Sequence, residues 1–206
     1  MNRAELKSKA KEQIKGKIGI LFVILLITIA LSYLTSLLAL VPLLGGIVST
    51  FLVTAPLSLG EAFVYLKVSH YKNVSVKDLF EGYNDLWSII KVQFFALFFI
   101  GLWSLLFIIP GIIKGFSYSM VYYILAENKG MGALEAIRRS KEMMDGHKME
   151  FFVLSLSFFG WFLLVGITFG IAGIWVIPYM SATMANFYNE IKGTETTIDA
   201  EAVIVD

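Results

Sequence analysis

The sequence predicts an all-α polytopic membrane protein with six transmembrane helices in three hairpins and amphipathic helices on the cytoplasmic side. Composition is the first reason, because 57% of the 206 residues are hydrophobic and only 16% are charged, against about 25% charged in an ordinary soluble domain. The second reason is a set of uncharged runs close to the roughly 20 residues that a helix needs to cross a bilayer. The third is the placement of lysine and arginine, which gather on one predicted side of these runs.

Three apolar runs are the clearest candidates for single crossings: Ile18–Leu40, Gly46–Leu66 and Met149–Phe169. The first has 23 residues without a charge, which exceeds the roughly 7–15 residues of a signal-peptide core, and no small-residue cleavage site follows it. We therefore expect it to be retained as a helix. A fourth candidate, Ile171–Tyr188, adjoins the third through Gly170.

The longest apolar run, Val92–Ala126, has 35 residues and a single charge, Lys114. As one helix it would reach about 52 Å at roughly 1.5 Å per residue, which is too long for one crossing. Proline lacks a backbone donor and glycine tolerates tight turns, so we expect Pro110-Gly111 to form a hairpin tip between Val92–Ile109 and Ile112–Ala126. Two alternatives stay open: one kinked helix, and a re-entrant loop, because the second arm is short for a full crossing.

The distribution of charge supports this topology. With the N-terminus inside, 16 of the 17 basic residues fall in the predicted cytoplasmic segments, and only Lys114 falls outside. This asymmetry is typical of multi-pass membrane proteins. Both termini are then cytoplasmic. We expect residues 1–190 to form a single transmembrane domain and residues 191–206 to form a flexible, acidic cytoplasmic tail.

A short polar segment with a glycine precedes each predicted hairpin. The three glycines, Gly16, Gly82 and Gly146, are spaced 66 and 64 residues apart. The second and third hairpins also begin alike, with "KVQFFAL" and "KMEFFVL". Three structural repeats are one interpretation. Chance similarity between apolar sequences of low complexity is the other.

Two internal cytoplasmic segments have the pattern of amphipathic helices. In the first, residues 74–91, Ser75 and Asp78 have the spacing of a capping box. In the second, residues 132–148, Arg138 with Glu142 and Lys141 with Asp145 are four positions apart. Such pairs favour a solvated face with locally neutralised charge. The alternative is a surface that docks on anionic lipid or on a partner protein. The candidate residues of that surface are Arg138, Arg139 and Lys141.

Motifs for catalysis or for metal and cofactor binding are missing from the sequence. There is no cysteine, and the two histidines, His70 and His147, are not in a metal-binding spacing. No nucleophile elbow or phosphate-binding loop occurs. A net charge of +1 gives no reason to expect nucleic acid. We therefore predict a protein that is not an enzyme and has no cofactor.

Glu61 is the one acidic residue plainly inside a predicted crossing, five positions after Pro56. Ionisable groups within a membrane are costly and are often functional, and a proline nearby frees backbone carbonyls. Glu61 is therefore a candidate intramembrane polar site. A structural role is the alternative, because Glu61 lies only six positions before Lys67, near the cytoplasmic end.

Three stretches also carry a family likeness: "IIPGIIKGFSYSMVYYILAEN", "ALEAIRRSKEMMDGHK" and "WVIPYMSATMANFY". With them the chain resembles the bacterial domain-of-unknown-function 975 family. More distantly, it is similar to the membrane domain attached to some glycerophosphoryl diester phosphodiesterases. The likeness covers most of the chain beyond about Ala55. It implies a multi-pass protein of the bacterial plasma membrane and brings no established activity.

These observations predict a non-enzymatic module that interacts with membrane lipids or with another membrane protein. A homo-oligomer is a further candidate assembly. The alternative is a small transporter or channel subunit that uses a polar site around Glu61.

Overall fold

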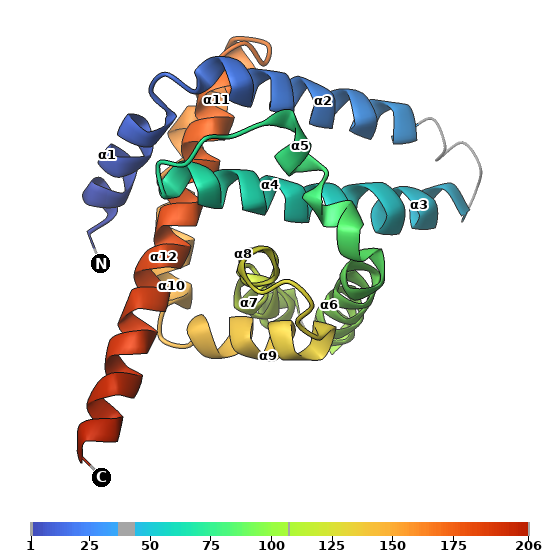
Figure 1. Ribbon diagram of the computed structural model, residues 1–206. Coiled ribbons are helices and arrows are strands. Elements are labelled where there is room, and N and C mark those ends of the chain that lie inside the picture. Colours follow the sequence, from blue (N-terminus) through green and yellow to red (C-terminus); the bar gives the residue numbers. More distant parts are fainter. Residues whose placement is uncertain (1, 37–43, 107, 206) are drawn as a thin grey trace.

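The computed structural model describes residues 2–36, 44–106 and 108–205. Every regular element within these ranges is a helix, as Figure 1 shows, which confirms the all-α fold class. The elements are α1 (Arg3–Ile14), α2 (Ile18–Ser36), α3 (Leu44–Val48), the π-helix η2 (Ser49–Thr54), α4 (Ala55–Ser69), α5 (Val76–Leu79), the 3₁₀-helix η3 (Glu81–Asp85), α6 (Leu86–Leu106), α7 (Ile108–Ser117), α8 (Val121–Glu127), α9 (Ala133–Met143), α10 (Lys148–Leu156), α11 (Phe159–Ile167) and α12 (Gly173–Val205).

Four helical stretches in the described residues are long and apolar enough to cross a membrane: Ile18–Ser36, Gly45–Ser69, Val76–Leu102 and Lys148–Ile167. In three of them only 11% of the most apolar window is buried inside the protein. Their apolar side chains therefore face outward. An exposed apolar surface of this extent requires an apolar solvent, which indicates a membrane protein.

Two of the six expected crossings are not among these candidates. Ile112–Ala126 is divided between α7 and α8. Most of Ile171–Tyr188 lies in α12, where polar side chains such as Thr183 and Asn186 dilute the apolar ones. In Figure 1, α12 also runs steeply across α2 and α4, which lie side by side. Much of this part of α12 is buried. The arrangement of six crossings in three hairpins therefore stays a prediction.

The expectation that Pro110-Gly111 forms a hairpin tip is wrong. Both residues lie in the first turn of α7, where the missing proline N–H has no helical acceptor to lose. α6 ends at Leu106 and α7 begins at Ile108, and residue 107 lies outside the described residues. The Tyr122 hydroxyl on α8 donates to Gln93 Oε1 on α6, so positions 29 residues apart meet. This contact excludes one long kinked helix.

Lys114 lies on the same side of the protein as α9, whereas the sequence predicted the opposite side of the membrane. It is close enough to Lys141 and Lys148 for charge repulsion between them. The Ser140 hydroxyl on α9 also donates to the Ser117 carbonyl oxygen at the end of α7, at 2.8 Å. These contacts contradict the expectation that Lys114 and α9 lie on opposite sides of the membrane. They favour the re-entrant alternative for the α6–α7 segment.

Cysteine labelling tests this placement, because the chain has no cysteine of its own. Cysteines introduced singly at Lys114 and Arg138 are expected to react with a membrane-impermeant maleimide from the same side, since α9 packs on the end of α7. The measurement is labelling of intact and of inverted membrane vesicles, with the exposed Lys15 as a reference position. Labelling of Lys114 and Arg138 from opposite sides would restore a full crossing by Ile112–Ala126.

The repeat is clear in two of the three predicted places. Gly16 and Gly146 follow α1 and α9 with φ angles of +81° and +77°, a left-handed conformation that glycine adopts without strain. Positions 10–20 and 140–150 show the same order of buried, half-buried and exposed side chains. Gly82 differs, because it lies within η3 and has no positive φ.

The apolar face of α9 is covered by the protein itself. Ala136, Ser140 and Met143 are buried, while Arg138 and Lys141 are exposed. The expected pair of Arg138 with Glu142 is present at 3.3 Å. The expected pair of Lys141 with Asp145 is wrong, because Asp145 pairs with Lys148 at 3.2 Å. α9 ends at Met143, so Asp145 does not continue its helical face.

α12 contacts α1, α2, α4, α9 and α11. Its backbone continues through the expected tail as far as Val205. The flexibility of residues 191–206 stays a prediction that the structure does not test.

Candidate functional site: a basic cleft and an apolar pocket with a common wall

A cleft of about 430 Å³ lies where the end of α4 meets α8 and α12. Three lysines and a histidine line it against one acid, so the formal charge of its wall is positive. We call this cavity the basic cleft. Its lining residues are Phe63, Leu66, Lys67, His70, Lys72, Ala126, Glu127, Asn128 and Lys192.

The C-terminal end of α4 positions the first half of this wall. α4 ends at Ser69, and His70 caps it with Nδ1 2.7 Å from the Leu66 carbonyl oxygen. The Lys72 backbone N–H donates to the Lys67 carbonyl oxygen at 2.9 Å, which holds both lysines at the same end of the helix. The exposed carbonyls of a helix C-terminus favour cations.

Lys17, at the start of α2, adds a further cation beside this wall. Its Nζ donates to the Lys72 carbonyl oxygen at 2.8 Å. Burial lowers the pKa of the Lys17 ammonium, because partial removal from water disfavours its charge. A nearby anion would offset that cost.

Two of the cleft lysines are already paired. Lys67 Nζ lies 2.7 Å from Asp78 Oδ1, and Lys192 Nζ lies 2.6 Å from Glu127 Oε2. The same Glu127 oxygen accepts the Tyr188 hydroxyl at 2.7 Å. Asp78 also accepts the Ser75 backbone N–H at 2.8 Å, as the capping-box spacing predicts. Among the described residues, Lys72 makes no ion pair, so its charge is available to an anion.

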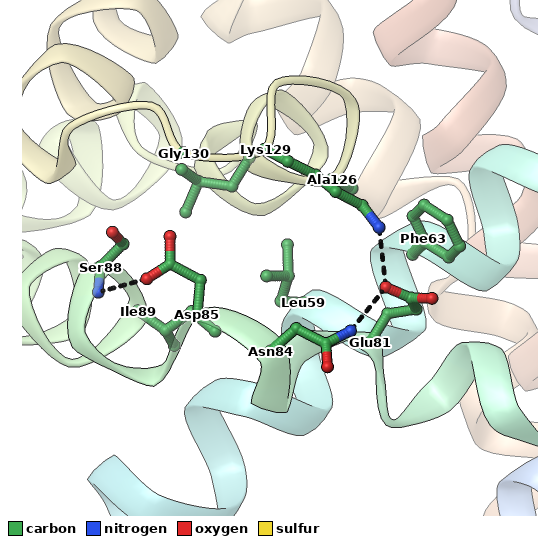
Figure 2. A pocket seen from close by; sticks show the side chains of 11 residues that line it. Leu59, Phe63, Glu81, Asn84, Asp85, Ser88, Ile89, Ala126, Lys129 and Gly130 are labelled. Carbon is green, nitrogen blue, oxygen red and sulfur yellow. Dashed lines mark hydrogen bonds and ion pairs between the residues drawn. The ribbon is translucent and has the colours of Figure 1, made fainter.

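A second cavity, of about 160 Å³, lies between α4, η3, α6 and the turn after α8 (Figure 2). Its floor is apolar, and its rim is polar. Phe63 and Ala126 line both cavities and so form a common wall. We call this cavity the apolar pocket. Its lining residues are Leu59, Phe63, Glu81, Asn84, Asp85, Ser88, Ile89, Leu125, Ala126, Lys129 and Gly130.

The rim of the apolar pocket carries one ion pair. Glu81 Oε2 accepts Lys129 Nζ at 2.8 Å and Asn84 Nδ2 at 2.9 Å, as Figure 2 shows. Lys67 and Lys129 both lie over the Phe63 ring, with Nζ 4.9 and 5.3 Å from its centroid. Such cation–π contacts hold the wall between the two cavities.

Comparison with known protein families assigns this chain to one of them. Residues 1–114 and 106–195 match the family described as protein of unknown function (DUF975). The chain belongs to the DUF975 family. No curated protein and no solved structure matches it. The family membership confirms the likeness carried by the Pro110–Lys148 region. The more distant similarity to a phosphodiesterase membrane domain is not shown, and DUF975 itself brings no activity.

Glu61 of this DUF975 protein lines neither cavity. It lies in α4, close to Thr28 of α2 and to the phenol groups of Tyr65 and Tyr123. Thr28 Oγ1 is buried, and the Glu61 carboxyl is its polar neighbour. Asn186 bonds to Gln13 and not to Glu61. The structure therefore gives Glu61 a polar neighbourhood, with partners that spacing did not predict.

The other candidate residues, Arg138, Arg139 and Lys141, also lie apart from both cavities. Arg138 and its partner Glu142 are 68% and 54% exposed, so their pair contributes little stability. Lys141 and Lys148 both lie close enough to Lys114 to repel its charge, and these three lysines form a separate basic cluster.

Sequence reasoning missed the basic cleft in this DUF975 chain. Lys67, Lys72 and Lys192 counted only toward the charge asymmetry between the two sides. They come from two segments about 120 positions apart. No local motif joins them, and only the packing of α12 beside α4 brings them together.

Proposed function

We propose that this DUF975 protein is a multi-pass protein of the bacterial plasma membrane that binds anionic lipids and performs no enzymatic chemistry. The basic cleft is the observation that carries the proposal. Anionic headgroups attract lysines at the membrane surface, with about 1 kcal/mol for each lysine close to it. In this proposal both termini and the cleft face the cytoplasm, the side on which the basic residues gather.

The composition of the cleft supports binding over catalysis. It offers ammonium groups, an imidazole and the Asn128 amide, which are donors suited to a phosphate. No serine, threonine or cysteine is among its lining residues to serve as a nucleophile. The apolar side chains of Phe63 and Leu66 lie beside these donors and suit the glycerol and upper chain carbons of a lipid. The exposed basic side chains of α9 supply a second, weaker attraction to the same surface.

Charge reversal in the cleft tests this role. Lys72→Glu is expected to weaken retention of phosphatidylglycerol by about tenfold, because it replaces the unpaired cation with an anion. The measurement is native mass spectrometry of protein exchanged between phosphatidylglycerol and phosphatidylcholine nanodiscs. Lys15→Glu makes the same charge change at an exposed position outside the cleft and serves as the control. Equal retention by Lys72→Glu and the control would refute the headgroup site.

A small transporter or channel subunit is the second candidate function. The Glu61 carboxyl within apolar helices, beside the buried Thr28 hydroxyl, favours it, because an ionisable group there is costly and is often functional. Glu61→Gln is expected to remove proton or cation flux through reconstituted protein. Flux is measured in liposomes with an entrapped pH dye, with the exposed Glu12→Gln as control. Undiminished flux in Glu61→Gln would discard this site.

A further inference from the structure

We propose that the apolar pocket binds a primary ammonium carried on a small apolar body, with the Asp85 carboxylate as its acceptor. This inference goes beyond the proposed binding of anionic lipid, because it concerns the other cavity and the opposite charge. Figure 2 shows Asp85 beside Ser88 on one side of the pocket and the Glu81–Lys129 pair on the other.

The size of the pocket defines the apolar body. Its volume of about 160 Å³ is close to the roughly 150 Å³ of an engineered apolar cavity that binds benzene. Leu59, Ile89 and Leu125 line the interior, and Ile89 and Leu125 are almost fully buried. A benzene-sized group would cover these side chains and displace water from them.

The charge on the rim of the apolar pocket favours a cationic ligand. Two carboxylates and one ammonium line the pocket, and Lys129 is held by Glu81 at 2.8 Å. Asp85 has no ion pair among the described residues, and its Oδ1 accepts a hydrogen bond from the Ser88 backbone N–H at 3.3 Å. The rim therefore keeps one uncompensated negative charge beside an apolar wall. Such a charge attracts cations and repels anions, more strongly than it would in bulk water.

The role of Asp85 as a helix N-cap uses only one of its two carboxylate oxygens. Asp85 precedes α6 and accepts from Ser88 three positions later, as a helix N-cap does. That role uses one carboxylate oxygen, Oδ1, and the other oxygen makes no hydrogen bond or ion pair within the described residues. Asparagine or serine would cap the helix about equally well. The capping role accounts for the hydrogen bond, and the helix dipole favours an anion at this end of α6. Neither effect uses the second carboxylate oxygen.

An ammonium has three N–H donors, and the pocket offers acceptors for them. The free oxygen of Asp85 accepts one, and the Ser88 hydroxyl lines the same side. The ligand can be a free amphiphilic amine or the ethanolamine headgroup of a lipid. Both carry the same primary ammonium, so the experiment distinguishes them.

Benzylammonium is the probe, with benzyl alcohol and benzoate as neutral and anionic matches of the same size. With the full chain in phosphatidylcholine nanodiscs, benzylammonium is expected to bind at least about tenfold more tightly than either match, since only the cation makes a charge-assisted hydrogen bond in this partly shielded site. Isothermal calorimetry measures the three affinities. Equal affinity for benzylammonium and benzyl alcohol overturns the proposal.

Asp85→Asn is the decisive variant, because asparagine keeps the helix cap and removes the charge. Its affinity for benzylammonium is expected to fall to that for benzyl alcohol, with an unchanged Tm for the free protein. The control is Asp145→Asn, which removes an exposed carboxylate that lines neither cavity. An unchanged affinity in Asp85→Asn overturns the assignment.

Ala126→Leu keeps the test decisive if Asp85→Asn does not fold, because the larger side chain fills the pocket from its wall. It is expected to abolish binding of all three probes, and continued binding overturns the proposal. Nanodiscs that contain phosphatidylethanolamine then show whether the bound ammonium belongs to a lipid headgroup or to a free amine. Competition with benzylammonium there supports the proposal with a lipid headgroup as ligand. Unchanged affinity there supports it with a free amine.

Discussion

Replacing Gly82 or Gly60 with alanine is expected to lower the free energy of unfolding by about 3 kcal/mol or more. A Cβ added at Gly82 would lie 2.0 Å from the Pro56 carbonyl oxygen, and one at Gly60 would lie 1.7 Å from the Leu79 carbonyl oxygen. Both obstacles are backbone atoms, which cannot move aside as a flexible side chain does. α4 and the α5–η3 segment would have to separate, and both segments line the candidate cavities.

Thermal unfolding in detergent measures this effect. Gly19→Ala and Gly101→Ala are matched controls, because nothing lies within 4 Å of a Cβ at either position. Each control is expected to be neutral or stabilising, since alanine favours a helix over glycine by about 1 kcal/mol. Gly60 is also helical, so its helix propensity acts in the opposite direction to the expected loss. An unchanged Tm in Gly82→Ala would disprove the close backbone contact.

The second large effect is expected at a buried amide pair. Gln13 Nε2 donates to Asn186 Oδ1 at 3.0 Å and to the Ser69 carbonyl oxygen at 2.8 Å, and Asn186 Nδ2 donates back to Gln13 Oε1 at 2.7 Å. Both amides are at most 6% exposed. Gln13→Leu leaves Asn186 buried without this partner and is expected to cost about 2–3 kcal/mol of unfolding free energy.

A double-mutant cycle separates the missing partner from lost packing. Gln13→Leu together with Asn186→Leu is expected to cost less than the sum of the two single variants, because no amide of the pair remains unsatisfied. Glu12→Leu, at the exposed neighbouring position, serves as the control. Simple additivity of the two single variants would contradict a coupled pair.

Three evenly spaced glycines show what a spacing pattern can and cannot predict. Gly16, Gly82 and Gly146 have nearly even spacing, for which three repeats were one interpretation and chance similarity the other. Two of them end a helix with a positive φ, whereas Gly82 permits a close contact with Pro56. Spacing alone cannot distinguish the two requirements, because one depends on the local backbone and the other on a segment 26 positions away.

Local chemistry alone determined the helical class, the apolar character of four long stretches, the capping interaction of Ser75 with Asp78 and the membership of the DUF975 family. The structural features among these depend on residues within one or two helical turns of each other, so they can be predicted from the order of residues.

Only the tertiary structure decided which groups meet. It placed Pro110-Gly111 inside α7, brought Lys114 beside Lys141, and joined Lys72 and Lys192 in one cleft. It also left Asp85 as the unpaired charge of the apolar pocket. The cost of burying a polar or charged group depends on the partners that distant segments supply, and the local sequence does not contain that information.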